Sequence, residues 1–429
     1  MSILNVNQIQ PVGSGQTVTI SATNIDTGSA TVTAGTFTGN LTGNATGLSG
    51  SPTLSGITSV STTNLTVNGN AYPSAGPLSN RNLIINGAMN VAQRGTSFAV
   101  TTSDTYTVDR FQTQHGGSFD FNSTLTQSST APAGFTSSLK VDVTSTSTPT
   151  ATQNGLIAHK VEAQNLQHLQ YGTSGAQTCT LTFWVRSNKT GTYCLQILQQ
   201  DASQYQLHEY SISSADTWEQ KTITIVGNTA TAINNDNGKG FDIRWHLACG
   251  SDDHVAASST WTGSSEGFLA TSNQVNLFDS TSNEWYLAGV QLEVGSVATP
   301  FEHRSYGQEL ALCQRYYKEV LALQGFQGQS FFTSHYGTTS AVNMIEAGLY
   351  NMRASVNTSL GPTGNTGNVQ YYSYSGTWTA STLAVTTIGV YPHQQIYLYA
   401  TADGDGRGKL MRRSGASDPA IYVEISAEL

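Results

Sequence analysis

The residues of this sequence best suited to binding chemistry are aromatic. A ring face stacks on the apolar face of a sugar, while nearby Asn, Gln or Asp side chains hydrogen-bond the hydroxyl groups. For any single ring, packing in a core or against a neighbouring subunit is the more common role. The candidate carbohydrate-binding residues are Trp184, Trp218, Trp245, Trp261, Tyr371, Tyr372, Tyr374 and Trp378.

The residues around Trp184 predict the direction in which its ring points. Phe183 and Val185 alternate with Thr182 and Trp184, which is the period of a half-buried strand. If Phe183 lies in the core, Trp184 faces the other side of the sheet. There it can line a groove or contact a neighbouring subunit.

Catalytic chemistry has less support in the sequence. Hydrolysis of a glycosidic bond uses two carboxylates that flank it. The acidic residues of the middle region are scattered, and no motif pairs them: Asp201, Glu209, Asp216, Asp252, Asp253, Glu266 and Asp279. No G-x-S-x-G elbow stands at a strand-to-helix junction, and Walker-type and H-E-x-x-H motifs are absent. We therefore expect no enzymatic activity, with a polysaccharide depolymerase as the alternative.

No cofactor is expected. The histidines show no ligand spacing. Residues 235–238 and 403–406 resemble parts of calcium loops, but a tight turn is the preferred interpretation and a structural calcium ion the alternative. Cys179 and Cys194 are predicted on two strands of one hairpin around 188–191. In that register Cys194 does not face Cys179, so free thiols are expected.

The composition excludes several classes of partner. Only 10% of the residues are charged, against about a quarter in a typical soluble protein. The net charge is −9 and no basic run occurs, so nucleic acid is not an expected partner. No apolar stretch approaches membrane-spanning length. The N-terminus lacks the pattern of a signal peptide, so release from a cytoplasm by lysis is the expected route to the outside.

Residues 1–80 predict a structure that several chains build together. Asp26 is their one charged residue, and an apolar residue recurs only every three to five positions. Such a sparse stripe cannot close a core within one chain, but three identical chains wound together can bury it. We therefore expect an intertwined β shaft in a homotrimer. A flexible Gly/Ser linker is the alternative.

The rest of the chain predicts an all-β fold with one helix. Alternating strands and turn clusters over 81–303 favour a jelly-roll β-sandwich. Residues 304–325 predict a connecting helix that starts with a Ser305–Gln308 capping box and stops at Gly325. Short strands, expected at 369–374, 383–390, 396–400 and 421–425, predict a small C-terminal β domain over 326–429.

Two segments resemble virion surface proteins of bacteriophages, including tail-fibre-like proteins. They read NLIINGAMNVAQRGTSFAVTTSDTYTVDRF at 82–111 and WYLAGVQLEVGSVATPFEHRSYGQELALCQRYY at 285–317. In that family the first segment is followed by a jelly-roll domain similar to carbohydrate-binding modules. The run GNLTGNATGLSGSP is similar to shaft segments of marine phage fibres, and YVEISAEL and Met352–Arg353 fit the terminal β domain that such proteins often carry.

The resemblance implies a trimeric fibre subunit, made in the host cytoplasm and exposed on the virion. It implies attachment to other virion proteins through the N-terminal segment and an exposed C-terminal end. Adhesion to a host-surface glycan or receptor, as in a tail fibre, is the expected function. A head fibre or other decoration protein is the alternative within the same class.

Overall fold

The computed structural model describes residues 80–100, 105–263, 267 and 269–318 with their side chains. It also describes the backbone of strands within 65–72 and 317–426. The predicted shaft therefore lies outside the described residues, apart from the antiparallel strands β1 (Leu65–Val67) and β2 (Asn70–Tyr72).

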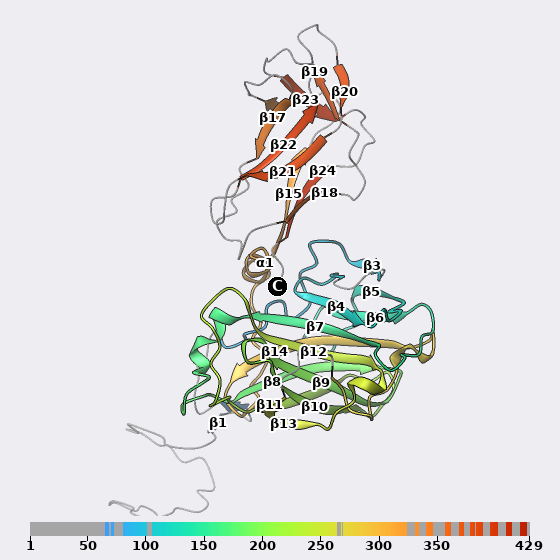
Figure 1. Cartoon of the computed structure of the whole chain (residues 1–429), viewed down its shortest axis with the longest axis vertical. Coiled ribbons are helices and arrows are strands. Elements are labelled where there is room, and N and C mark those ends of the chain that lie inside the picture. Colours follow the sequence, from blue (N-terminus) through green and yellow to red (C-terminus); the bar gives the residue numbers. More distant parts are fainter. Residues whose placement is uncertain are drawn as a thin grey trace, which may run out of the picture. The chain divides into compact units, whose positions relative to one another are not determined.

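Two six-stranded antiparallel sheets form a β-sandwich (Figure 1). Sheet I has the order β11 (Glu219–Ile225), β8 (Cys179–Ser187), β14 (Glu284–Val294), β6 (Ser138–Val143), β5 (Ser123–Ser128) and β3 (Ser97–Ala99). Sheet II has the order β13 (Ser258–Thr262), β10 (Gln204–Ile212), β9 (Gly191–Gln199), β12 (Lys239–Cys249), β7 (Asn154–Glu162) and β4 (Phe111–Gly116). The connections hold the 3-10 helices η1 (Ala163–Leu169), η2 (Gln200–Ala202), η3 (Ser251–Asp253) and η4 (Leu277–Asp279). The prediction of an all-β fold with a jelly-roll sandwich is confirmed.

One hydrophobic core fills the space between the sheets. Phe183 and Val185 of β8 face it from sheet I, and Leu195 and Ile197 of β9 face it from sheet II; all four are fully buried. Trp245 of β12 lies between them, 5.8 Å from the ring of Phe183 in an edge-to-face contact. Removing each large apolar side chain from water contributes about 1.5–3 kcal/mol. Alternation along β8 therefore places Phe183 and Val185 on its core face, whereas β7, β12 and β14 are buried on both faces over most of their length.

The hairpin predicted around 188–191 is wrong, because β8 belongs to sheet I and β9 to sheet II. The chain crosses between the sheets here, and Gly191 makes the crossing possible with φ +131 and no room for a Cβ beside Val275. Both strands present an apolar face to the same core, so alternation alone does not distinguish a hairpin from a crossing. Cys179 packs in the central core and Cys194 on the outer side of sheet II, and none of the four cysteines forms a disulfide.

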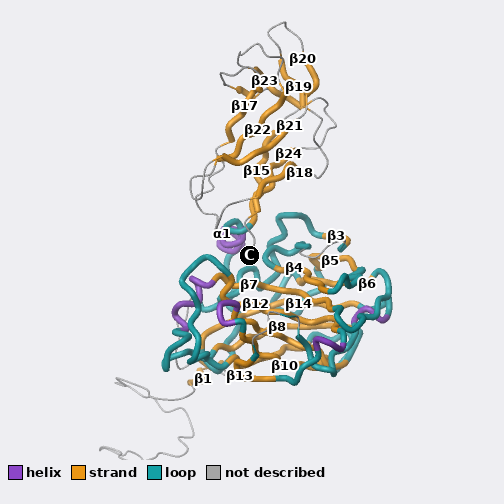
Figure 2. The backbone as a smooth tube through the Cα atoms, in the orientation of Figure 1, coloured by secondary structure: helices purple, strands orange, loops and turns teal. Residues whose placement is uncertain are grey.

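The one α-helix of the described residues, α1, runs over Tyr306–Cys313 (Figure 2). Its predicted start is confirmed. The Ser305 hydroxyl accepts a hydrogen bond from the Gln308 N–H, and Gln308 Oε1 accepts one from the Ser305 N–H at 3.1 Å. No helix in this described part of the chain is long and apolar enough to cross a membrane.

The predicted extent of the helix to residue 325 is wrong. Strand β15 (Tyr317–Leu323) replaces its second half and pairs with β24 (Ile421–Ser426). Tyr316, just before β15, is buried and donates its hydroxyl hydrogen to Glu162 at 3.0 Å. Pairing with a strand about a hundred residues away outweighs the local helical pattern, because helix propensities are small beside tertiary contacts.

The C-terminal strands form three antiparallel sheets. The first has the order β15, β24 and β18 (Asn357–Gly361). The second has the order β16 (Phe331–Thr333), β23 (Lys409–Arg413), β19 (Val369–Tyr372) and β20 (Trp378–Ser381). The third has the order β17 (Ser340–Ile345), β22 (Gln395–Thr401) and β21 (Leu383–Ile388). Strands thus occur at each of the four positions predicted in this region.

Candidate functional site

Aromatic side chains gather on the outer surface of sheet I. We call this surface the aromatic face and define it by Phe135, Trp184, Trp218, Tyr286 and Phe301. Trp184 lies on β8 and Tyr286 on β14, while Trp218 immediately precedes β11. Because β8, β11 and β14 are neighbours in the sheet, rings from distant parts of the sequence meet on one surface.

Strand alternation places Trp184 on this surface. Its neighbour Phe183 is fully buried in the core, whereas Trp184 is half-buried and points to the other side of β8. The prediction for its direction is therefore confirmed. Across the sheet Trp184 lies opposite Gln220 of β11 and Ala288 of β14. The indole therefore has an amide-bearing residue on one side and a small residue on the other.

Tyr286 is the centre of the aromatic face. Its ring lies 6.0 Å from that of Trp218 at 68°, an edge-to-face contact. The Arg186 guanidinium lies 4.9 Å from the ring centroid and the Lys140 ammonium 5.7 Å, on the two strands that flank β14. Cations near an aromatic face are attracted by its quadrupole. This cation–π attraction stabilises the positions of Tyr286 and of the two cations.

Carboxylates hold the two cations in place. The ammonium of Lys140 bonds Glu284 at 2.8 Å, and Arg186 bonds Asp216 at 2.9 Å. Burial lowers the pKa of Lys140, but the hydrogen bond to Glu284 and the nearby negative charges outweigh burial, so its pKa lies above the usual value. Burial likewise raises the pKa of Glu284, yet its bonds to Lys140 and Tyr286 bring it below normal. Both groups are therefore charged at neutral pH.

A glycine in β14 completes the surface. The register of β14 shifts between Ala288 and Gln291, and Gly289 adopts φ +58 in this bulge. A Cβ on Gly289 would lie 2.6 Å from the ring of Phe135 and 2.9 Å from that of Trp184. Phe135 in turn packs edge-to-face on Phe301 at 4.9 Å. The bulge thus makes room for Phe135 to lie beside Trp184.

Trp245 and Trp261 do not lie on this surface. Trp245 is wrong as a sugar-binding residue, because it is fully buried in the core. Trp261 is on sheet II, where its ring stacks on Phe241 at 6.0 Å and its N–H donates to the Val226 carbonyl oxygen at 2.7 Å. In the C-terminal strands Tyr372 pairs with Trp378 across β19 and β20. Tyr371 also lies in β19, whereas Tyr374 lies outside the described residues.

The candidate acids are separate hydrogen-bond acceptors in the structure. Asp201 accepts from Asn234 at 2.7 Å, Asp253 from Asn154 at 3.0 Å and Glu209 from Asn273 at 3.0 Å. Asp279 pairs with Lys189 at 2.5 Å. Glu266 lies outside the described residues. Residues 235–238 form a turn in which Asp236 accepts from the Gly238 N–H at 2.8 Å, and the described residues contain no group of three or more His, Cys, Asp or Glu able to hold a metal.

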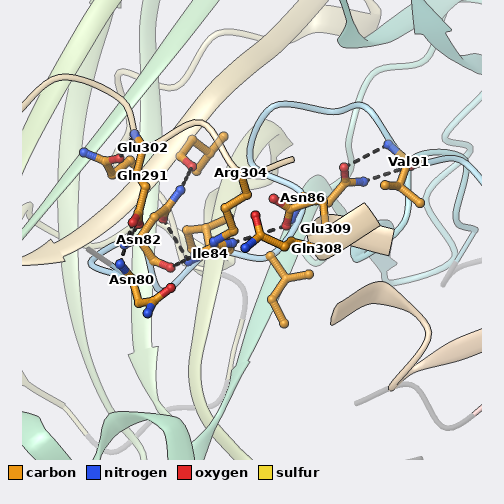
Figure 3. A network of polar contacts seen from close by, with 12 residues as sticks. Asn80, Asn82, Ile84, Asn86, Val91, Gln291, Glu302, Arg304, Gln308 and Glu309 are labelled. Carbon is orange, nitrogen blue, oxygen red and sulfur yellow. Dashed lines mark hydrogen bonds and ion pairs between the residues drawn. The ribbon is translucent and has the colours of Figure 1, made fainter. Parts of the chain in front are cut away.

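A second polar site joins the start and the end of the sandwich (Figure 3). We call it the polar clamp, formed by Asn82, Asn86, Glu302, Arg304 and Glu309. Glu302 accepts from the backbone N–H groups of Asn80 at 2.5 Å and Asn82 at 2.8 Å. Arg304 donates to the carbonyl oxygens of Ile84 at 3.0 Å and Asn82. Glu309, in α1, accepts from the Asn86 N–H and from Arg304 at 3.3 Å.

The chain leaving α1 is bound to the same sandwich. The guanidinium of Arg315 bonds both oxygens of the buried Glu162, at 3.0 and 2.7 Å. Such a two-point ion pair is among the stronger polar contacts in proteins. The Arg110 guanidinium lies 3.5 Å from the ring centroid of Tyr316, and that of Arg94 lies 3.6 Å from that of Tyr317. The two sequence segments at 82–111 and 285–317 therefore meet at one junction.

The sequence did not single out Tyr286, Phe135 or Gly289. Tyr286 alternates with the buried Trp285 and Leu287, so its outward direction was readable from the strand pattern. Phe135 precedes β6 in a loop, and its place beside Trp184 depends on the bulge at Gly289. No local sequence signal reports such a contact.

No protein-family profile matches the sequence, and no curated protein matches it. Several solved structures are similar to parts of the chain. The enzymatically active domain of tailspike protein 4 of bacteriophage CBA120 is 10% identical with a TM-score of 0.25, over 50% of this chain and 21% of that one. A putative sugar-binding protein from Bacteroides thetaiotaomicron is 10% identical with a TM-score of 0.29, over 50% of this chain and 100% of that one. A family 11 carbohydrate-binding module from Clostridium thermocellum is 8% identical with a TM-score of 0.25, over 48% and 99%.

Proposed function

We propose that this chain is the subunit of a trimeric bacteriophage fibre that adheres to a glycan on the host surface through the aromatic face. The observation that carries the proposal is the grouping of half-buried Trp184 and Trp218 around Tyr286 and the two cations, on the outside of a jelly-roll sheet. The same surface offers ring faces and hydrogen-bonding groups side by side. These are the two elements of sugar recognition.

The charges on the aromatic face favour a neutral glycan. Lys140 and Arg186 supply two positive charges, and Asp142, Asp216 and Glu284 supply three negative ones. The cations are already paired with carboxylates. They can still donate N–H hydrogen bonds to hydroxyl groups, but the surface has no excess of positive charge that would attract a polyanion. A sheet surface with several rings suits a run of sugar units along a polysaccharide better than a single terminal sugar.

The fibre part of the proposal is supported by the sequence. Residues 1–80 carry too few apolar side chains for a core of their own, which favours a shaft shared by three chains. The N-terminal segment would join the fibre to other virion proteins. Three weak sugar sites on one particle, and several fibres on a virion, raise avidity by orders of magnitude without any new contact. The proposed role needs no enzymatic activity and no cofactor.

The double substitution Trp184→Ala/Trp218→Ala is expected to abolish measurable glycan binding. Loss of one aromatic contact with the ligand costs about 2 kcal/mol of binding free energy, which is about a thirtyfold rise in Kd for each ring. The wild-type protein is first screened on an array of neutral bacterial polysaccharides. The strongest ligand is then titrated against both proteins by isothermal calorimetry.

The matched control is Tyr306→Ala, which removes an exposed aromatic side chain from α1 outside the aromatic face. It should bind the polysaccharide as the wild type does. Unchanged affinity of the Trp184→Ala/Trp218→Ala protein would rule out the aromatic face as the binding site. Circular dichroism establishes that both variants are folded.

The proposed trimer leads to a separate prediction. Light scattering of the full chain should give about three times the 45.5 kDa mass of one chain. Deletion of residues 1–80 should leave a folded sandwich that no longer joins the virion. A clean monomer would remove the fibre proposal while leaving the binding test of the aromatic face intact.

A further inference from the structure

Sheet II carries a pocket on its outer surface, on the other side of the sandwich from the aromatic face. Glu209 of β10 pairs with Cys194 of β9, and the next residues along, Tyr210 and Tyr193, lie in the core. Alternation therefore places Glu209 on the outside of sheet II. The pocket has a volume of about 320 Å³. Its walls come from the segments 254–257, which follows η3, and 271–273.

The pocket holds a carboxylate that is fixed on one side and open on the other. The Thr271 hydroxyl and the Asn273 amide, the latter at 3.0 Å, both donate to Oε1 of Glu209. The second oxygen, Oε2, has no donor in the part of the chain that the structure describes. Two neighbours thus fix the rotamer of Glu209 and leave one acceptor for a ligand.

A second polar group in the pocket lacks a partner. Nε2 of His254 is shielded from water and accepts or donates no hydrogen bond among the described residues. Beside it, Val255, Ala256 and Ala257 form an apolar wall. Because Nε2 is shielded from solvent, a ligand in the pocket would contact the imidazole ring and this apolar wall, and would form its hydrogen bond with Glu209.

We propose that this pocket, the Glu209 pocket, is a second carbohydrate site that takes a single neutral or amino sugar unit. The free carboxylate oxygen accepts from hydroxyl or ammonium groups, and the apolar wall covers a C–H face of the ring. A volume of about 320 Å³ accommodates a hexose unit. The single negative charge of Glu209 repels acidic sugars such as uronic or sialic acids. The choice of a sugar as the ligand rests on the proposed function of glycan adhesion. The position of the pocket does not depend on the aromatic face.

The test is saturation-transfer NMR on the full chain. The probes are the methyl glycosides of glucose, galactose, mannose, N-acetylglucosamine, glucosamine and glucuronic acid. At least one neutral or amino sugar should show saturation transfer, and glucuronic acid should show none. Glu209→Gln should raise the Kd of the bound sugar at least tenfold, as measured from the saturation-transfer signal over a titration. Ala256→Trp, at an exposed position of the wall, should block the pocket without touching the core.

Asp201→Asn is the matched control, because it removes one exposed charge in η2, outside the pocket, and its remaining side-chain oxygen still accepts one of the two hydrogen bonds from Asn234. The Trp184→Ala/Trp218→Ala protein should retain the monosaccharide signal, so failure of the aromatic face and failure of the pocket are distinguishable. The proposal is overturned if no probe binds the wild type. It is equally overturned if both Glu209→Gln and Ala256→Trp bind as the wild type does.

Discussion

Replacement of Gly87 by alanine is expected to lower the free energy of unfolding by about 3 kcal/mol. Gly87 lies directly on β14, where its carbonyl oxygen accepts from the Val290 N–H at 2.9 Å. A Cβ at this position would stand 2.0 Å from the Val290 carbonyl oxygen. The obstacle is backbone, which cannot rotate away as a side chain would. Asn82 donates to that same carbonyl oxygen at 3.2 Å, so the strain would spread into the polar clamp.

Gly307→Ala is the matched control. Gly307 lies in the first turn of α1, and a Cβ there would meet no atom within 4 Å. Alanine restricts the unfolded chain more than glycine does, so the control should gain about 0.5 kcal/mol. Urea denaturation of both variants measures the difference. Equal stability of Gly87→Ala and the wild type would show that the segment at 82–91 does not lie against β14.

Acid is expected to unfold the sandwich steeply. Burial, followed by the nearby Arg110, lowers the pKa of His159 to about 3; burial and Arg244 do the same for His246. In the unfolded chain each titrates near 6.5. The unfolded state therefore binds more protons between these values, so stability is complete above about pH 6.5 and falls as the pH drops. The slope approaches about 2.7 kcal/mol per pH unit for two groups.

Denaturant titrations at pH 7.5, 6.5, 5.5 and 4.5 measure this slope. His246→Leu removes one of the two protonation steps, and both ring nitrogens of His246 lack a partner among the described residues, so no hydrogen bond is sacrificed. The variant should show about half of the wild-type slope and no loss of stability at neutral pH. A slope unchanged by His246→Leu would mean that other groups govern the acid response.

The sequence predicted the faces of strands well and their partners poorly. Alternation around Phe183 and Trp184 gave the correct inner and outer sides, because burial acts on each residue locally. The predicted pairing of β8 with β9 was wrong, since both sheets present similar apolar faces to one core. The Ser305–Gln308 capping box marked the start of α1, but its end depended on pairing with β24, which no local pattern contains.

The candidate site was predictable only in part. Residue type predicts Trp184 and Trp218, which share one surface, but it equally predicts Trp245, which is buried. Residue type does not separate a core tryptophan from a surface one when strand direction is unassigned. The Glu209 pocket joins residues from β10 and two loops far apart in the chain. Only the folded chain brings them together.

The polar clamp has a mechanical consequence. The chain enters the sandwich at 80–86 and leaves it through 302–317, and these two segments are bonded directly to each other. Tension applied to the two ends of the chain would therefore pass through the carboxylate and guanidinium bonds of Glu302, Arg304 and Glu309 before it reached either sheet. Those bonds would share the load before any strand of the sandwich was separated from its neighbour. The aromatic face on sheet I would therefore keep its shape under such tension.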